Sequence, residues 1–295
     1  MSQNHYSDPI KIKLLADSTC QHFVINRAFK DFLTKSKLTT FDAVWSFPEG
    51  KLVKKKGLRS VLCVHFGENV FYFKKHTELL NPLTKLILFF RAVISRSEGL
   101  KEFYNYCAFR SKGLGTAIPV AAGMRYTSWL TIESFLITQD FSPLIDLEEI
   151  VLNQPELLQG DNNLARKHNI LRAIGQYARK MHQSGFNHKD FNATHLLLND
   201  IDAKNPQIAL FDLQRVDKVI FNRFRWTIKS LSELFYTLPA NIFSENDRCF
   251  LFKEYKETKI LSWLDKMQYQ CILKKIARIA RHCRKRNLSP KMKED

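Results

Sequence analysis

The chain has 295 residues, of which 45% are hydrophobic and 23 are Phe, whereas only 10 are Gly. This composition excludes a disordered or low-complexity chain and predicts a substantial core, in one large domain or in two lobes. The net charge of +17 favours an anionic partner, whether nucleic acid, a phosphorylated glycan or an anionic membrane face. The sequence has no recognised nucleic-acid-binding motif, so we expect no nucleic-acid partner.

The six cysteines are scattered and form no CxxC pair, which argues against a zinc ribbon or a thioredoxin-like site. Their apolar neighbours predict buried free thiols in a reducing compartment. Residues 1–8 are polar and lack the apolar segment of a signal peptide. Because no apolar run approaches transmembrane length, we expect a cytoplasmic protein.

Strands are predicted to dominate the first part of the chain. A short helix is expected at Asn26–Thr34. Two β-rich runs, Val61–Phe66 and Val70–Lys74, flank the turn Gly67–Asn69 and predict a hairpin. Residues 82–96 have the pattern of an amphipathic helix with basic flanks, which is either an ordinary buried helix or a segment that enters the membrane interface.

Helices are predicted to dominate the second part. Residues 98–112 have helical periodicity and end before Gly113, and a strand is expected at Ser134–Thr138. Further helices are predicted at 164–184, 225–237, 245–257 and 268–285. A strand-rich part followed by a helix-rich part indicates an α+β fold with two lobes.

The most informative segment is His188–Leu198, together with the apolar strand that ends at Asp212. In the kinase pattern H-R-D-x-x-x-x-N, the Asp is the catalytic base, and a later Asp binds metal. Asp190 takes the base position here, and His195 stands where that pattern has Asn. Phosphoryl transfer needs mainly positioning and charge neutralisation. One carboxylate at the acceptor hydroxyl and another holding Mg²⁺ therefore predict an ATP-dependent kinase.

A different interpretation is a metal site built from His188, Asp190, His195 and Asp212, since these residue types can ligate zinc or iron. The two histidines are separated across a loop, and the chain has no HExxH or CxxC spacing. We therefore favour the kinase interpretation.

The kinase pattern predicts a phosphate-contacting lysine at the end of a strand, which is Lys74 here. A helical Glu that pairs with it would hold it over the phosphates. Glu102 is the candidate for that role, and Glu98 competes with it.

The usual glycine-rich loop before this lysine is missing. The basic run Lys54–Ser60 occupies its place, so Gly57 and Arg59 are expected to cover the phosphates. The strand at 134–138 leads into the position of a kinase hinge. This position predicts nucleotide contacts from Thr138, Gln139 and Phe141.

Taken together, these motifs resemble the bacterial lipopolysaccharide kinase family, the Kdo and core-heptose kinases, from about residue 51 to residue 285. The most discriminating detail is His195, because the core-heptose kinases also have His at this position of the loop. Four further segments are similar: Tyr72–His76, Ser134–Asp140, Phe211–Arg215 and Arg225–Leu234.

The resemblance implies a two-lobed, protein-kinase-like α+β fold. Residues 1–50 would form an N-terminal extension and residues 51–140 a small, strand-rich N-lobe. Residues 141–295 would form a larger, mainly helical C-lobe that ends in a basic helix.

The resemblance also implies roles for the site residues. Asp190 would be the base, Lys74 and Glu102 would address ATP, and Asp212 and His195 would address Mg²⁺. The implied reaction is ATP-dependent phosphorylation of a heptose or Kdo hydroxyl on the lipid A–core of lipopolysaccharide. It would take place at the inner face of the cytoplasmic membrane, whose anionic surface attracts a basic protein.

Two departures from the family pattern leave alternatives open. Gln214 replaces a His, and Ser230 replaces an Asp that by kinase analogy would brace the catalytic loop. The alternatives are a kinase with a small-molecule or protein acceptor, and a non-catalytic pseudokinase. Because the catalytic residues are retained, we favour an active enzyme.

Overall fold

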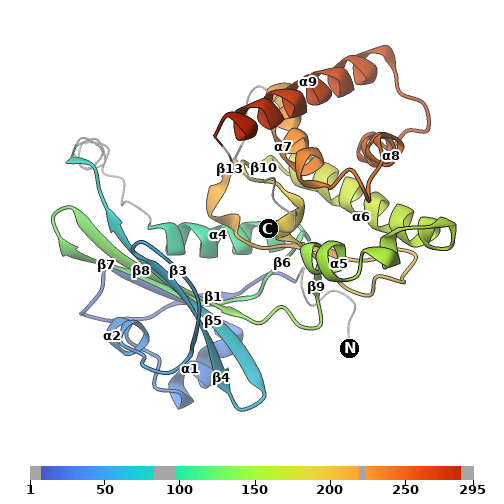
Figure 1. The fold of residues 1–295 in the computed structure, drawn as a ribbon. Coiled ribbons are helices and arrows are strands. Elements are labelled where there is room, and N and C mark those ends of the chain that lie inside the picture. Colours follow the sequence, from blue (N-terminus) through green and yellow to red (C-terminus); the bar gives the residue numbers. More distant parts are fainter. Residues whose placement is uncertain (1–7, 83–96, 219–222, 287–295) are drawn as a thin grey trace. The chain divides into compact units, whose positions relative to one another are not determined.

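The computed structural model describes residues 8–82, 97–218 and 223–286 (Figure 1). The chain forms two compact units. Unit 1 comprises Met1–Gly113 and Ala117–Asp140, and unit 2 comprises Leu114–Thr116 and Phe141–Asp295. The helix predicted at residues 82–96 falls almost entirely outside the described residues.

In the described residues, unit 1 is built on one antiparallel sheet of seven strands, in the order β1-β2-β7-β8-β5-β4-β3. The strands are β1 (Ile12–Leu14), β2 (His22–Asn26), β3 (Lys51–Lys56), β4 (Arg59–Phe66), β5 (Asn69–Leu79), β7 (Pro119–Ser128) and β8 (Thr131–Gln139). The predicted hairpin corresponds to β4 and β5, whose turn includes Gly67 at a positive φ of 62°.

Alternation along β5 decides which side chains reach the core. Phe71 and Phe73 are buried on one face, so Lys74 lies on the opposite face, as the two-residue period of a strand requires. Lys74 is paired in register with Val61 of β4 and Leu136 of β8. The neighbouring strands β4 and β8 therefore hold the backbone of Lys74 in place from both sides.

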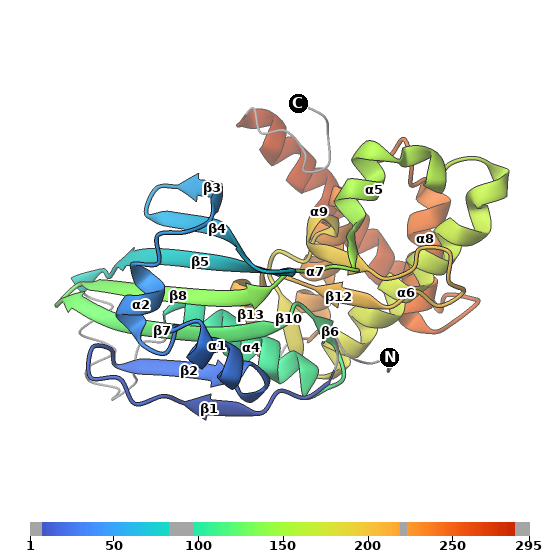
Figure 2. The same ribbon diagram turned by 90° about the horizontal axis from the view of Figure 1, so that it is seen from below.

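Helices cover both faces of this sheet. Figures 1 and 2 show α4 (Glu98–Arg110) on one face, and α1 (Lys30–Lys35) and α2 (Phe41–Trp45) on the other. The core between α1, α2 and the sheet is rich in phenylalanine. Phe23 packs edge-on against Phe135 with 5.3 Å between the ring centroids.

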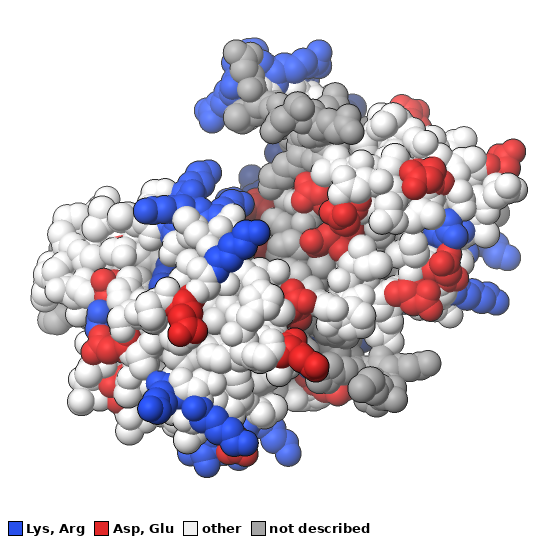
Figure 3. Space-filling view, turned by 60° about the horizontal axis from the view of Figure 1, so that its bottom comes forward, with Lys and Arg blue, Asp and Glu red and all other residues white. Residues whose placement is uncertain are grey.

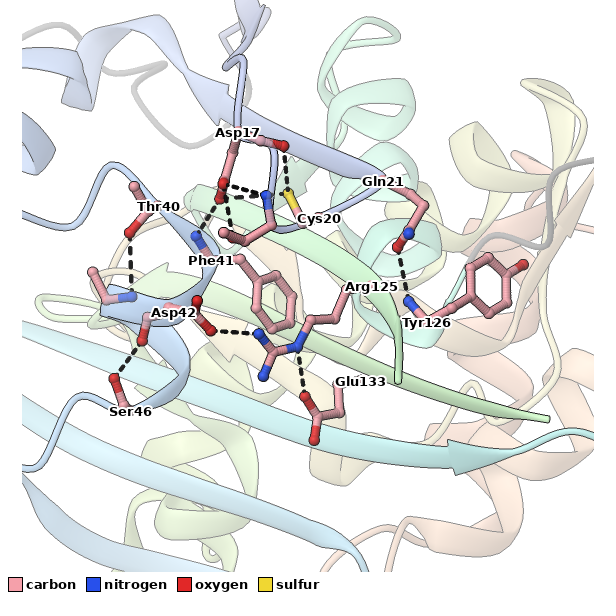
Figure 4. Close-up of polar contacts among 12 residues, drawn as sticks. Asp17, Cys20, Gln21, Thr40, Phe41, Asp42, Ser46, Arg125, Tyr126 and Glu133 are labelled. Carbon is pink, nitrogen blue, oxygen red and sulfur yellow. Dashed lines mark hydrogen bonds and ion pairs between the residues drawn. The ribbon is translucent and has the colours of Figure 1, made fainter. Parts of the chain in front are cut away.

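Residues before β3 are packed onto this sheet. Arg125 of β7 binds Asp42 of α2 and also Glu133 of β8, at 2.8 Å for the latter, as Figure 4 shows. The guanidinium carbon lies 4.6 Å from the centroid of the Phe41 ring. Asp17 accepts a 2.6 Å hydrogen bond from the backbone N–H of Phe41. These contacts attach the segment that the sequence suggested to be an N-terminal extension.

Unit 2 is mainly helical. Its α-helices in the described residues are α5 (Leu147–Asn153), α6 (Leu164–Gln183), α7 (Arg223–Thr237), α8 (Glu245–Lys256) and α9 (Trp263–Lys285). Helix α9 begins earlier than predicted because of a capping box. Asp265 donates its N–H to Ser262 Oγ at 3.2 Å, and its carboxylate accepts the Ser262 N–H at 3.3 Å.

Two small sheets complete unit 2. One has the order β6-β12-β11-β9, and in the other β10 pairs with β13. The strands are β6 (Gly115–Thr116), β9 (Ile145–Asp146), β10 (Phe186–His188), β11 (Leu196–Leu198), β12 (Ile208–Leu210) and β13 (Val216–Lys218). Because β11 and β12 are antiparallel, the residue before β11 and the residues after β12 lie at the same end of the hairpin. The predicted α+β class is confirmed.

All six cysteines are free thiols, and each is partly exposed. The prediction that they are buried was therefore wrong. Apolar neighbours in the sequence do not determine which face of a helix or strand a side chain occupies.

A histidine links three helices of unit 2. His182 of α6 lies 3.1 Å from Ser230 Oγ of α7 through Nε2, and 3.1 Å from Tyr255 Oη of α8 through Nδ1. Burial lowers the pKa of His182 from 6.5 to about 4. The ring is therefore neutral at neutral pH.

We predict that this histidine makes unit 2 less stable in mild acid. Between pH 6.5 and about 4, the unfolded chain binds a proton at residue 182 and the folded chain does not. Stability therefore falls as the pH falls, by up to about 1.4 kcal/mol per pH unit from this residue. In urea unfolding at several pH values, His182→Gln should show a shallower dependence on pH. The exposed-site control His65→Gln should retain the wild-type slope, and equal slopes for His182→Gln and wild type would contradict the prediction.

Candidate active site

Asp190 follows β10 and pairs with an arginine of the same unit. Its Oδ2 lies 2.5 Å from Nη1 of Arg215, which ends the short 3₁₀ helix Leu213–Arg215. The Arg215 side chain is 57% exposed, so water weakens the attraction and the pair contributes little to folding stability. Its structural effect is to orient one carboxylate oxygen of Asp190.

His188 joins the two loops that carry the predicted catalytic carboxylates. Its Nε2–H donates to the backbone carbonyl of Asp212 at 2.9 Å, and the backbone N–H of Asp190 donates to its Nδ1 at 3.1 Å. A carbonyl only accepts and an amide N–H only donates, which fixes the tautomer. Burial lowers the pKa of His188, in agreement with a neutral ring.

Asp212 has φ 58° and ψ 56°, the left-handed backbone conformation that residues other than Gly rarely adopt. This conformation turns the chain directly after β12. The carboxylate is consequently presented at the end of the β11–β12 hairpin, beside the residue that precedes β11.

That residue is His195. Its Nδ1 donates to the backbone carbonyl of Asp190 at 3.2 Å, and its Nε2 lies 3.8 Å from Oδ2 of Asp212. The Phe211 ring packs against the imidazole with 5.4 Å between centroids, and Phe141 stacks on Phe211 at 5.0 Å. The structure therefore brings the two predicted metal residues of unit 2 together.

The pair of His195 and Asp212 fits a metal ion that is also bound by other groups. Imidazole nitrogen and carboxylate oxygen are both common metal ligands. Within the described ranges, no three His, Cys, Asp or Glu residues gather as a complete site. Phosphate oxygens and water would have to supply the remaining ligands, as is usual for a nucleotide-bound metal. The four-residue zinc or iron site is not supported, because both His188 nitrogens bind backbone atoms.

In unit 1, Lys74 and Glu102 are in contact. Lys74 Nζ lies 2.8 Å from Glu102 Oε1 of α4, and this carboxylate also accepts the Tyr106 hydroxyl at 2.7 Å. Glu102 is only 4% exposed. A buried carboxylate with two donors holds the ammonium group in a defined position.

Glu98, the competing candidate, has other partners. It binds the Arg59 guanidinium, and its carboxylate lies 3.1 Å from His76 Nδ1. Arg59, predicted to contact phosphate, is therefore part of an ion-pair cluster in unit 1. Gly57 occupies the β3–β4 turn at φ 56° and has open space around its Cα.

The three predicted hinge residues lie where unit 1 passes into unit 2. Thr138 is buried in β8, and the Gln139 N–H donates to the Ile118 carbonyl at 2.9 Å. Phe141 belongs to unit 2, where it stacks on Phe211. Their nucleotide contacts stay a prediction.

The loop that carries Asp190 is braced by Thr237, for which the sequence predicted no role. The backbone N–H of Ala193 donates to Thr237 Oγ1, at the end of α7, at 2.9 Å. Ser230, at the position expected to brace the loop, contacts His182 of α6. A threonine in a last helical turn has no distinctive sequence signal. Arg215 ends the segment Phe211–Arg215 that is similar to the family, but its contact with Asp190 has no sequence signal.

The family model "Lipopolysaccharide kinase (Kdo/WaaP) family" matches residues 51–255. The lipopolysaccharide core heptose(I) kinase WaaP of Escherichia coli is 25% identical, over 64% of this chain and 71% of that protein. The enzyme of the same name from Pseudomonas aeruginosa is 24% identical, over 52% of this chain and 61% of that protein.

A solved structure of WaaP in complex with acyl carrier protein shares the fold, with a TM-score of 0.65 and 20% identity. The similarity covers 88% of this chain and 98% of that chain. It confirms the predicted two-lobed, kinase-like fold. Since the family model matches most of the sequence, the chain belongs to the Kdo/WaaP lipopolysaccharide kinase family.

Proposed function

We propose that the protein is an ATP-dependent kinase that phosphorylates a heptose or Kdo hydroxyl of the lipopolysaccharide core. The observation that carries this proposal is the His188 bridge, which holds Asp190 and Asp212 in one constellation in a member of this family. The curated relatives are named core heptose(I) kinases. Those names favour the sugar acceptor over a small-molecule or protein acceptor.

Asp190 would act as the base. Its Oδ2 is held by Arg215, so we assign Oδ1 to the acceptor hydroxyl. A carboxylate in this role orients the hydroxyl and takes its proton as the bond to phosphorus forms. The loop is fixed on both sides, by His188 and by Thr237, which favours an active enzyme over a pseudokinase.

The remaining residues would bind the nucleotide. Bound Mg²⁺ neutralises charge on the phosphates of ATP, and Asp212 and His195 are the residues that would hold it. Lys74 would contact the phosphates, oriented by Glu102. Gly57 and its basic neighbours in the β3–β4 turn would cover them, with side-chain charge in place of a glycine-rich loop.

Helix α9 supports a peripheral position on the cytoplasmic membrane. Exposed apolar residues gather near its start, and exposed basic residues continue at helical spacing along the same face. The apolar residues are Ile260, Trp263, Leu264 and Met267, and the basic ones are Lys274, Arg278, Arg281 and Lys285. Lys and Arg side chains gather at the top of Figure 3, where α9 ends.

This face fits an anionic bilayer. Trp and Leu favour the interface, and each nearby Lys or Arg adds about 1 kcal/mol of attraction to acidic lipid. Among the described helices, none has both the length and the apolar character needed to cross a bilayer. We therefore propose surface attachment through α9.

The first experiment measures transfer of labelled γ-phosphate from ATP to purified, dephosphorylated lipid A–core. We predict transfer by the wild type and a loss of roughly 10²- to 10⁴-fold in Asp190→Ala, because general-base catalysis has that magnitude. The control is Asp161→Ala, at an exposed aspartate of the same unit, and it should match the wild type. Undiminished transfer by Asp190→Ala would refute the role of Asp190, and absence of transfer by the wild type would refute this acceptor.

The second prediction concerns the lysine. Lys74→Met should lower kcat/KM for ATP by roughly 10- to 100-fold, since a charge-assisted hydrogen bond is lost. Glu102→Gln should reduce it in the same direction, because the ammonium group loses its ion partner. Glu98→Gln, which breaks the Arg59 pair, should lower kcat/KM less than Glu102→Gln does. The control is Glu68→Gln, at an exposed glutamate of the β4–β5 turn, and it should match the wild type. If Glu98→Gln is impaired and Glu102→Gln is not, the lysine partner has been assigned to the wrong glutamate.

The third prediction concerns the membrane. Replacing Trp263, Leu264 and Met267 with Ser should weaken binding to phosphatidylglycerol-containing vesicles by at least about tenfold, since this change removes apolar area from the interface. Cosedimentation at low and high salt measures the effect, and salt should weaken the wild type as well. The control is Trp129→Ser, an exposed tryptophan of unit 1. Equal binding by the triple variant and this control would exclude α9 as the attachment site.

A further inference from the structure

An exposed arginine lies beside the proposed catalytic base of unit 2. Arg215 Nη1 is 2.5 Å from Asp190 Oδ2, and the arginine side chain is 57% exposed. We propose that Arg215 is a specificity residue that binds a carboxylate of the acceptor, next to the hydroxyl that is phosphorylated. This inference rests on the proposed kinase function, and it assigns the chemical class of the acceptor at that same site.

The backbone fixes Arg215 against the loop that carries Asp190. Its carbonyl oxygen accepts the Lys189 N–H at 3.1 Å. The next residue, Val216, is paired with His188 where β10 and β13 form their ladder. Arg215 is thus held to the loop through its backbone and through its side chain. A group that binds this arginine would therefore be positioned relative to Asp190 itself.

Most of the hydrogen-bonding capacity of Arg215 is left for a ligand. A guanidinium has five N–H donors in a planar fork. Within the described residues, the acceptor that these donors reach is Asp190 Oδ2, and no other. The neighbouring cation of the loop, Lys189, instead binds Asp217 at 2.6 Å. Arg215 is therefore the cation beside the base that can take a further anion.

The remaining edge of the guanidinium fits a carboxylate. Arginine binds planar anions through two parallel N–H groups, which gives the contact a defined direction. Kdo is a sugar acid, so a dephosphorylated core that contains it still offers a carboxylate. The acceptor hydroxyl is assigned to Oδ1 of Asp190, and Arg215 holds Oδ2 of the same group. A hydroxyl and a carboxylate on one sugar, or on adjacent sugars, would therefore be bound side by side.

Two acceptors that differ in this charge test the assignment. One is dephosphorylated lipid A–core, and the other is the same material with its carboxylates converted to methylamides. The wild type should have a kcat/KM about 10- to 100-fold higher for the first acceptor, the magnitude of a lost charge-assisted hydrogen bond. Arg215→Gln should bring this ratio close to one. Arg215→Lys, which keeps the charge without the fork, should give an intermediate ratio, and it serves as the second variant if Arg215→Gln does not fold.

The ratio separates recognition of the acceptor from the effect of Arg215 on Asp190. A change in the orientation of Asp190 lowers turnover of both acceptors equally and cancels in the ratio. The control Arg179→Gln, which breaks an ion pair with Glu257, should keep the wild-type ratio. A wild-type ratio near one, or an unchanged ratio in the Arg215 variants, would overturn the role of Arg215 and leave the kinase proposal intact. Transfer to neither acceptor by the wild type would overturn the proposed acceptor and this inference with it.

Discussion

The two hydrogen bonds of the His188 ring determine the geometry of the candidate site. One reaches the Asp212 carbonyl and the other receives the Asp190 N–H, so two loops distant in sequence share one rigid connection. Both bonds involve backbone atoms, and the connection therefore leaves the two carboxylates available for chemistry. It works only while the ring is neutral, since a second ring proton would face the Asp190 N–H. Burial of His188 maintains that state by lowering its pKa.

The helices behind the loop replace one strong brace with several weaker contacts. An aspartate at position 230 would offer a charged acceptor, whereas Ser230 instead joins His182 of α6. Thr237 offers only a neutral hydroxyl, and its Oγ1 accepts the Ala193 N–H at 2.9 Å. Neutral hydrogen bonds each contribute about 1 kcal/mol, so this support depends on the packing of α6, α7 and α8 around them. The rigidity of the loop that carries Asp190 is thereby coupled to the helical core of unit 2.

The parts of the site that the sequence predicts are those governed by local rules. The loop motif and Asp212 lie at one end of a hairpin, and the kinase pattern predicts Lys74 at the end of a strand. The choice of Glu102 over Glu98 as its partner required the structure. The Arg215–Asp190 and Thr237–Ala193 contacts were not predictable, because each depends on how separate elements pack. The same reason applies to β1 and β2, which have three and five residues: β2 pairs with β7, and β1 pairs with β2.

Two elements of the described residues, β3 and α9, carry clusters of exposed basic side chains. Strand β3 exposes Lys51, Lys54, Lys55 and Lys56 on unit 1, beside a turn whose Gly57 is open to solvent. A single glycine supplies few backbone amides for phosphate, so these ammonium groups are the available source of positive potential there. On α9 of unit 2, basic side chains instead follow an exposed apolar turn, a combination suited to a lipid surface and poorly suited to a soluble nucleotide. The charge that first suggested an anionic partner thus fits both proposed partners, ATP phosphates at the hairpin and acidic lipid at the helix.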